Sequence, residues 1–377
     1  MRSSFSVRFC LALIILFLAG CKSSGSQPEK PEEPDGSESF SAVWVTSTAS
    51  SVLQSHTNIR EAVALCAQSG IQHIFVVVWN QGRTLYPSQV MERQFGVRIA
   101  EPYRGRDPLQ EMITEAHEKG IKVHAWFEYG FAASYNENGG LILQQKPDWA
   151  ARDAEGNLLK KNGFEWMNAF HPEVQDFMIS LVTEVVEQYD VDGVQGDDRL
   201  PAMPSTGGYD AYTVASYKKQ HEGTAPPSDY TDSEWVEWRA GLLTDFQGRL
   251  YQAVKAIKPD VLVSCAPSVH PWAKNEYLQD WPAWLDKGYA DLVIPQVYRY
   301  DIAAYQATLK QQLDFLKPAH RTKFYPGVLL QNADYNPSTE FLEQMIDENR
   351  RQGIRGESFW FFEGIKKFPL FFEHYRK

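Results

Sequence analysis

Cysteine is scarce in this sequence. The 377 residues include four cysteines, Cys10, Cys21, Cys66 and Cys265. The first two belong to an apolar N-terminal segment and its end, which leaves Cys66 in a predicted helix and Cys265 at a predicted strand end. Two such distant residues cannot form a disulfide framework or a thiolate metal motif, so we expect both to be buried free thiols.

Basic charge and long apolar runs are also limited. The apolar run at 9–20 is too short to span a bilayer. Lys and Arg number 37 against 48 Asp and Glu, which gives a formal net charge of -11. Loss of residues 1–20 would remove Arg2 and Arg8 and leave about -13. Such a surface repels nucleic acid and anionic lipid head groups, so we expect no nucleic-acid partner and a neutral or cationic ligand.

The N-terminus has the pattern of an export signal, with two arginines before the apolar run. Residues 1–20 end in "LAG" before Cys21, which resembles the bacterial lipobox, where cleavage leaves the cysteine as the lipidated first residue. The alternative is a plain secretory signal with an incidental cysteine. Residues 21–39 are rich in Ser, Gly, Pro and Glu and predict a flexible tether. We therefore expect a membrane-anchored lipoprotein of the bacterial envelope, in the outer membrane and on its periplasmic or cell-surface side.

From residue 40 to 377, short β-branched runs alternate with amphipathic helical segments, the pattern of a parallel sheet with crossover helices. The predicted strands are 42–46, 73–79, 122–128, 192–197, 261–265, 292–298, 323–329 and 357–362. Eight such units in one chain of this length predict an α/β fold, a TIM (β/α)8 barrel, whose chemistry lies at the carboxyl ends of the strands. Gly-Ile pairs at 70–71, 120–121 and 353–354 predict helix ends followed by strand starts.

Two connections of this barrel are unusually long. They follow strands three and four, at about 129–171 and 198–232. Long connections in a compact domain are usually functional or disordered. Their Gly, Asn, Trp and Tyr content predicts that they form the walls of a cleft.

Carboxylates stand at the mouth of the predicted barrel. Because side chains alternate along a strand, Glu128 at the end of strand three and Asp197 at the end of strand four should face the interior. Asp198 follows just past the strand, and it either joins the site or supports a turn. Adjacent strands lie about 5 Å apart, so Glu128 and Asp197 could meet. The competing interpretation of Asp197 is a strand-end turn former.

The same alternation directs further polar and aromatic residues inward. His124 is interpreted as a packed histidine with a hydrogen-bond partner, because no second histidine stands at metal-ligand spacing. The other expected inward or mouth positions, some of which could stack on sugar rings, are Trp79, Tyr86, Trp126, Gln195, Trp272, Gln296 and Tyr298. Glu363 follows strand eight, nearly across the barrel from strand four.

Paired carboxylates at a barrel mouth suit glycoside hydrolysis. One acid protonates the leaving oxygen, and the other attacks the anomeric carbon, stabilises it or activates water. Crowding raises the pKa of one of them, so one proton can remain near neutral pH. No cofactor or metal is expected.

An ordered series of segments resembles a known family. They are "TSTASSVL" (46–53), "VWNQGRTLYPS" (78–88), "AWFEYGF" (125–131), "HPEVQ" (171–175), "YDVDGVQGDDRLPAMPSTGGYD" (189–210), "EWRAGLLTDF" (237–246), "YLQDWPAWL" (277–285), "PQVYR" (295–299) and "FFEG" (361–364). The chain resembles the bacterial glycosyl-hydrolase-like family 10, which are TIM-barrel proteins, often exported and in some branches linked to peptidoglycan glycan strands.

The resemblance implies functional residues. These are Asn80, Arg83, Glu128, Asp197, Asp198, Gln296, Tyr298 and Glu363. Two positions depart from the family pattern: Gly196 replaces a bulky apolar residue, and Arg199 stands where an aromatic residue or histidine is common. Gly196 is expected to loosen the packing behind Asp197. Arg199 is expected to lower the pKa of a neighbouring carboxyl group and to contact substrate.

The resulting functional hypothesis is a glycoside hydrolase of the cell envelope. It would act on a β-linked polysaccharide that contains amino sugars, with peptidoglycan glycan as first candidate and a dietary or host polysaccharide equally reachable from an outward-facing anchor. An alternative from another class is a glycan-binding lipoprotein without catalysis. A metal-dependent deacetylase is a third reading and requires a cluster of His and Asp ligands.

Overall fold

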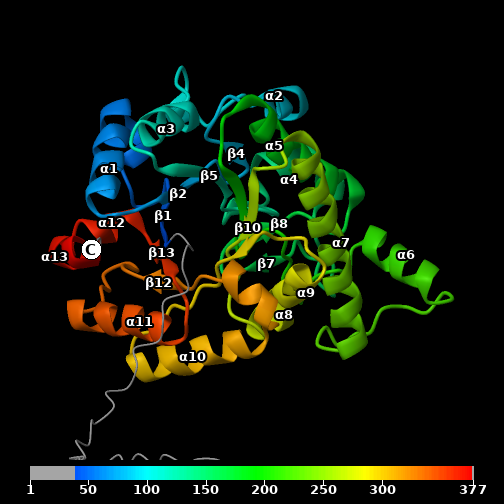
Figure 1. Ribbon diagram of the computed structural model, residues 1–377. Coiled ribbons are helices and arrows are strands. Elements are labelled where there is room, and N and C mark those ends of the chain that lie inside the picture. Colours follow the sequence, from blue (N-terminus) through cyan, green and yellow to red (C-terminus); the bar gives the residue numbers. More distant parts are fainter. Residues whose placement is uncertain (1–38, 376–377) are drawn as a thin grey trace, which may run out of the picture. The chain divides into compact units, whose positions relative to one another are not determined.

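The computed structural model describes residues 39–375, which form one barrel domain (Figure 1). The predicted export signal at 1–20, the lipidation site Cys21 and nearly all of the tether at 21–39 lie outside the described residues. Those expectations therefore remain predictions.

Eight parallel strands form the barrel. In chain order they are β1 (Phe40–Val45), β2 (His73–Val77), β5 (Lys122–Phe127), β9 (Gly193–Gly196), β10 (Leu262–Cys265), β11 (Leu292–Val293), β12 (Gly327–Leu329) and β13 (Gly356–Trp360). The sheet runs β11-β10-β9-β5-β2-β1-β13-β12. Two parallel bridges, Val293 with Phe324 and Gln296 with Gly327, join its two ends and close the ring.

Helices surround this ring and cover the outer faces of the strands (Figure 1). The α-helices are α1 (His56–Gln68), α2 (Gln89–Phe95), α3 (Pro108–His117), α4 (Gly140–Gln145), α5 (Pro172–Gln188), α6 (Ala211–Gln220), α7 (Ser233–Ile257), α8 (Trp272–Tyr277), α9 (Trp281–Asp286), α10 (Ile302–Asp314), α11 (Thr339–Arg351), α12 (Phe362–Ile365) and α13 (Pro369–Tyr375). None of the helices within 39–375 is long and apolar enough to cross a membrane.

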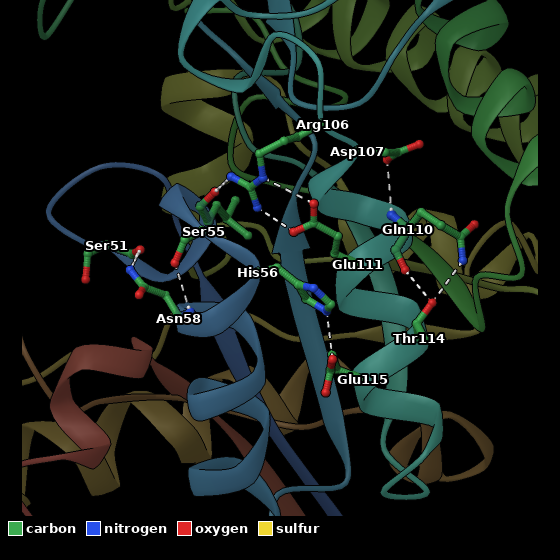
Figure 2. A network of polar contacts seen from close by, with 11 residues as sticks. Ser51, Ser55, His56, Asn58, Arg106, Asp107, Gln110, Glu111, Thr114 and Glu115 are labelled. Atoms are coloured by element: carbon green, nitrogen blue, oxygen red, sulfur yellow. Dashed lines mark hydrogen bonds and ion pairs between the residues drawn. The ribbon is translucent and has the colours of Figure 1, made fainter.

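Side-chain caps lie at the start of two of the helices next to β1, β2 and β5. The Ser55 side chain accepts a hydrogen bond from the Asn58 amide at the start of α1, and Asp107 caps α3 in the same way through Gln110. The two helices lie side by side, and a hydrogen bond of 2.7 Å joins His56 of α1 to Glu115 of α3 (Figure 2). This outer layer fixes the strands whose ends carry the site.

The predicted order of strands is confirmed, although most strands are shorter than expected, β11 and β12 by the largest margin. β11 ends at Val293 and β12 begins at Gly327, because Pro295 and Pro326 lack the N–H that a ladder hydrogen bond requires. The Gly-Ile pairs take their predicted place: Gly70, Gly120 and Gly353 have positive φ angles of 72°, 70° and 77° after their helices. Cys66 and Cys265 are buried free thiols, as expected.

The two long connections carry secondary structure of their own. The first contains α4 and a three-stranded antiparallel sheet of β6 (Ala132–Tyr135), β8 (Phe164–Trp166) and β7 (Lys160–Lys161). The second contains α6. They meet where the Phe131 amide donates to the carbonyl oxygen of Arg199 at 2.9 Å. This contact holds the small sheet over the end of β9.

Candidate functional site

The carboxyl ends of β5 and β9 bring two acidic residues together. The strands are neighbours, and their last paired residues are Phe127 and Gly196. Glu128 and Asp197 each follow directly, one residue beyond this last pair. Their exposed fractions are 8% and 3%. Both side chains are therefore buried at the carboxyl ends of neighbouring strands.

Arg199 contacts both Glu128 and Asp197. Its Nη2 donates to Asp197 Oδ2 at 3.0 Å, and its Nη1 lies 2.7 Å from Asp198 Oδ1. Its Nε donates to the main-chain oxygen of Glu128 at 2.9 Å. The guanidinium plane lies over the Phe164 ring of β8, 4.5 Å from its centroid. One cation thus contacts both of the strand ends that carry the acids.

Burial raises the pKa of all three carboxyl groups. For Asp197 the pKa lies well above its usual value, because burial and the charges of Asp198 and Glu128 outweigh the opposing charge of Arg199. For Glu128, burial raises the pKa while Arg199 and the Asn80 amide oppose the rise. Three carboxyl groups face one guanidinium here, so full ionisation would leave uncompensated charge in a buried site.

Two glutamines fix Asp197. Gln296 Nε2 donates to Asp197 Oδ1 at 3.1 Å, from the segment after β11. Gln279 is fully buried, and its Nε2 donates to the main-chain oxygens of Asp197 and Pro201 at 3.0 and 3.2 Å. The inward position of Gln296 was predicted. Gln279 lies in a helical connection where no alternation pattern marks it, so sequence reasoning missed it.

Gly196 does not loosen the packing behind Asp197, contrary to expectation. The chain turns back immediately after β9, and the Leu200 amide donates to the Asp197 carbonyl oxygen at 3.1 Å. A Cβ atom at Gly196 would lie 2.1 Å from the Leu200 carbonyl oxygen. Glycine is therefore required by close backbone approach.

Three of the predicted inward residues lie below the mouth. His124 is fully buried, and its Nε2 lies 2.9 Å from His73 Nδ1. Trp126 and Gln195 occupy paired positions one layer above it, and both are buried. Gln195 accepts from Trp44 Nε1 at 2.7 Å. Alternation correctly placed these side chains inside the barrel, but it does not give depth along the axis, so the expectation that they contact substrate at the mouth is wrong.

Two aromatic residues after β2 also do not reach the mouth. Tyr86 is fully buried, and its hydroxyl bonds Glu184 of α5 at 3.2 Å. Trp79 is fully buried too, and its Nε1 donates to the Gly130 carbonyl oxygen at 2.9 Å. Both belong to packing between the β2 connection and its neighbours, which corrects their assignment as sugar-stacking residues.

Aromatic rings form a floor below the carboxyl groups. Trp360 of β13 packs against Trp126, Trp44 and Tyr298, with ring centroids 5.8, 6.0 and 6.1 Å away. Burial raises the pKa of Tyr298 well above its usual value, so its hydroxyl stays protonated. That hydroxyl is buried without a hydrogen-bond partner among the described residues. Trp360 was not among the predicted site residues, although the same alternation could have marked it.

Two cavities are lined by hydrogen-bond partners of the acids. One of about 640 Å³ is lined by Gln296, Tyr298, His270 and Trp272, and the Trp272 side chain is 47% exposed. The other is about 360 Å³ and is lined by Asn80, Arg83, Ser47 and Thr48, among others. Asn80 Nδ2 donates to Glu128 Oε2 at 2.7 Å. Each cavity thus touches a residue that is hydrogen-bonded to one of the two acids.

Glu363 lies in α12, directly after β13, which is four strands from β9 in the ring of eight and therefore opposite Asp197. Its Oε1 accepts from Ser50 Oγ at 2.9 Å, and its Oε2 pairs with Lys366 at 2.6 Å. This position across the barrel agrees with the sequence analysis. Within residues 39–375, no group of three or more His, Cys, Asp and Glu side chains could hold a metal ion.

Comparison with known proteins agrees with this architecture. The chain is 28% identical to the glycosyl hydrolase DigH of Escherichia coli strain K12, with 84% of this chain and 81% of the relative covered. It is 24% identical to the glycosyl hydrolase YngK of Bacillus subtilis strain 168, with 80% of this chain and 62% of the relative covered.

Solved structures share the fold at low identity. The glycoside hydrolase domain of PgaB (BpsB) from Bordetella bronchiseptica matches with a TM-score of 0.65 at 15% identity, over 90% of this chain and 98% of that domain. The catalytic domain of beta-amylase from Paenibacillus polymyxa matches with a TM-score of 0.63 at 9% identity, over the same shares. These likenesses establish the TIM-barrel fold.

The family model described as glycosyl hydrolase-like 10 matches residues 39–334, which include Glu128, Asp197, Asp198 and Arg199. Because this match spans most of the chain and contains the acidic cluster, the protein belongs to the glycosyl hydrolase-like 10 family.

Proposed function

We propose that the protein is a glycoside hydrolase in which Glu128 and Asp197 form the acid and base pair. The observation that carries this proposal is the juxtaposition of two buried carboxyl groups on neighbouring strands at the open end of the barrel. Family membership and the names of the curated relatives support glycosidase activity. The arrangement suits hydrolysis because the reaction needs one protonated and one ionised carboxyl group.

Hydrogen bonding distinguishes the roles of the two acids. Both oxygens of Asp197 accept from N–H donors, one from Arg199 and one from Gln296. Glu128 accepts from an amide of Asn80 at Oε2, and Arg199 contacts its main-chain oxygen and not its carboxyl group. A guanidinium stabilises the ionised form of the group it contacts. Burial raises the pKa of both groups, that of Asp197 well above its usual value, but only Asp197 pairs directly with the guanidinium. On the strength of this direct ion pair we assign the negative charge to Asp197 and the proton, which passes to the leaving oxygen, to Glu128.

Asp197 then acts at the anomeric carbon, either by attack or by activation of water. Asp198 shares Arg199 with it, so a change of charge on one aspartate is felt by the other. The buried Tyr298 hydroxyl next to this pair is a free donor for a sugar oxygen or for the developing negative charge. Trp272 offers a half-exposed ring on which a sugar can stack.

The proposed substrate is a polysaccharide of the cell envelope, with peptidoglycan glycan strands as first candidate. The acidic overall charge disfavours nucleic acid, and the predicted lipid anchor at Cys21 would hold the protein beside the envelope. We also propose the anchor itself. Labelling with a radioactive fatty acid should mark the full-length protein in bacterial cells and should be lost in Cys21→Ser.

The experiment on function uses purified protein with whole peptidoglycan, amidase-stripped peptidoglycan and a panel of neutral polysaccharides. Products are identified by mass spectrometry. We expect new reducing ends from one of these substrates and loss of turnover by at least 1000-fold in Asp197→Asn and in Glu128→Gln, with unchanged thermal unfolding cooperativity. Near-parental turnover in Asp197→Asn would remove that residue from the mechanism. Binding that survives in the double variant, with no products from the parental protein, would instead favour a glycan-binding protein without catalysis.

A further inference from the structure

Arg83 is a partly buried arginine without a carboxylate partner. Arg93 of the same connection also forms no ion pair among residues 39–375, but its side chain is exposed. Three neighbours in the connection between β2 and α3 are ion-paired: Arg98 with Glu92, Arg104 with Glu101, and Arg106 with Glu111. Figure 2 shows the last of these pairs. Arg83 Nη1 donates only to the carbonyl oxygen of Gly82, at 3.2 Å. Among residues 39–375, it forms no ion pair. Arg83 is therefore a partly buried cation that is available to pair with an anion of a bound ligand.

A tight hairpin fixes Arg83 beside the proposed acid. β3 (Trp79–Asn80) and β4 (Arg83–Thr84) are antiparallel, and Asn80 lies directly opposite Arg83. Gln81 and Gly82 between them have φ angles of 48° and 65°, as a type I′ turn requires. A Cβ atom at Gly82 would lie 2.7 Å from the Ala133 carbonyl oxygen, so the turn is pressed onto β6.

The hairpin places Arg83 next to the side chain that binds the proposed acid, Glu128. Directly opposed residues of an antiparallel pair carry their side chains on the same face, about 5 Å apart at Cβ. The Asn80 side chain on this face donates to the Glu128 carboxyl group. Arg83 is therefore one cross-strand step from the side chain that holds the proposed acid.

Arg83 lines two cavities. It lines the cavity of about 360 Å³ that also contains Asn80, and it lines a second cavity of about 1020 Å³ over the connection between β2 and α3. Glu137 lines the first cavity as well, and its charge acts on Arg83 although the two form no ion pair. On the other side of the carboxyl pair, the cavity beside Gln296 and Trp272 contains an aromatic platform.

We infer that Arg83 binds a carboxylate carried by the glycan on the Glu128 side of the bond that is cleaved. This inference rests on the proposed function and adds the substrate class, a glycan with acidic sugar substituents. A guanidinium binds a carboxylate through two parallel hydrogen bonds, and a partly buried cation gains most from a partner anion. The chain carries a net charge of -11, so an acidic glycan needs a local cation of this kind to approach.

The test compares one glycan in two charge states. Peptide-free peptidoglycan glycan strands carry free carboxylates, and carbodiimide coupling to ammonia converts these to neutral amides while leaving phosphate esters intact. The proteins are the parent, Arg83→Gln, Arg83→Lys and the control Arg104→Gln, which removes an exposed arginine paired with Glu101. Both kcat/KM and the affinity measured by titration calorimetry are determined for each combination.

We expect Arg83→Gln to lower kcat/KM and affinity on the native strands by roughly 10- to 100-fold, the range for one charge-assisted hydrogen-bonded contact. Arg83→Lys should lose less, and Arg104→Gln should match the parent. On amidated strands the parent should fall by a similar factor, and the effect of Arg83→Gln should disappear.

Equal losses for Arg83→Gln on native and amidated strands would overturn the inference, and so would parental behaviour of Arg83→Gln on both. If the parental protein cleaves neither glycan, the proposed function fails, but calorimetry still decides whether Arg83 distinguishes the two charge states. Unfolding temperatures of the variants separate loss of binding from loss of fold.

Discussion

Replacing Arg199 by methionine should destabilise the fold in a way that depends on pH. Methionine keeps an apolar stem over Phe164 but removes the charge from a site where the side chains of Arg199, Asp197 and Asp198 are 13%, 5% and 26% exposed. Removal of one member of a buried ion pair costs about 3–5 kcal/mol, because the remaining charge is left without compensation. We expect that loss at pH 8.

The cost should shrink at low pH. Burial already raises the pKa of Asp197 and Asp198, and loss of the Arg199 charge raises it further. A carboxyl group whose pKa is higher in the folded than in the unfolded state binds protons more tightly when folded, so its unfavourable effect develops as pH rises through the folded pKa. A larger fraction of these groups is protonated at pH 5 than at pH 8, so the missing cation costs less there, and the loss moves toward the value of about 1–2 kcal/mol that broken hydrogen bonds contribute at any pH.

Urea denaturation at pH 5 and pH 8, followed by fluorescence of the 11 tryptophans, measures both values. Arg104→Met is the matched control, because Arg104 and Glu101 are 76% and 72% exposed and such a pair contributes about 0–1 kcal/mol at either pH. An equal deficit of Arg199→Met at the two pH values would refute the electrostatic reasoning and leave Arg199 as a packing residue.

Two further substitutions test the geometry around the acids. Gly196→Ala places a Cβ atom 2.1 Å from the Leu200 carbonyl oxygen, so we expect displacement of Asp197, a destabilisation of about 1–3 kcal/mol and a large loss of turnover; an unchanged unfolding midpoint would contradict this. Asn80→Ala removes an amide that lowers the pKa of Glu128. The high-pH limb of kcat/KM should therefore move to higher pH, and a shift to lower pH would show that Glu128 is not the acid.

Much of the barrel follows from simple sequence patterns. Runs of β-branched residues, followed by helices with Gly-Ile ends, predicted all eight strands in their order. Alternation also predicted that Glu128 and Asp197 face the same opening, since parallel neighbours present their last inward residues at one edge. These features depend on local periodicity, which the sequence expresses directly.

The depth of a side chain below the barrel mouth, and its contacts with residues distant in the sequence, could not be predicted in the same way. Trp126 and Gln195 face inward like Glu128, yet they are sealed one layer below it by Trp360 and Trp44. Arg199 was expected to influence a nearby carboxyl group, but its contact with the Glu128 main chain depends on how the two long connections fold back. Such contacts join residues far apart in the chain, and no periodic signal encodes them.

The way the ring closes affects where the barrel opens locally. The edge between β11 and β12 is held by hydrogen bonds from Tyr325 to Val293 and from Gly327 to Pro295, whereas β2 and β5 share a ladder of five paired residues. We expect amide hydrogen exchange to be fastest along this seam. Gln296 lies on it and holds Asp197, so transient opening of the seam would release one of the carboxylate's donors and couple slow backbone motion to its ionisation.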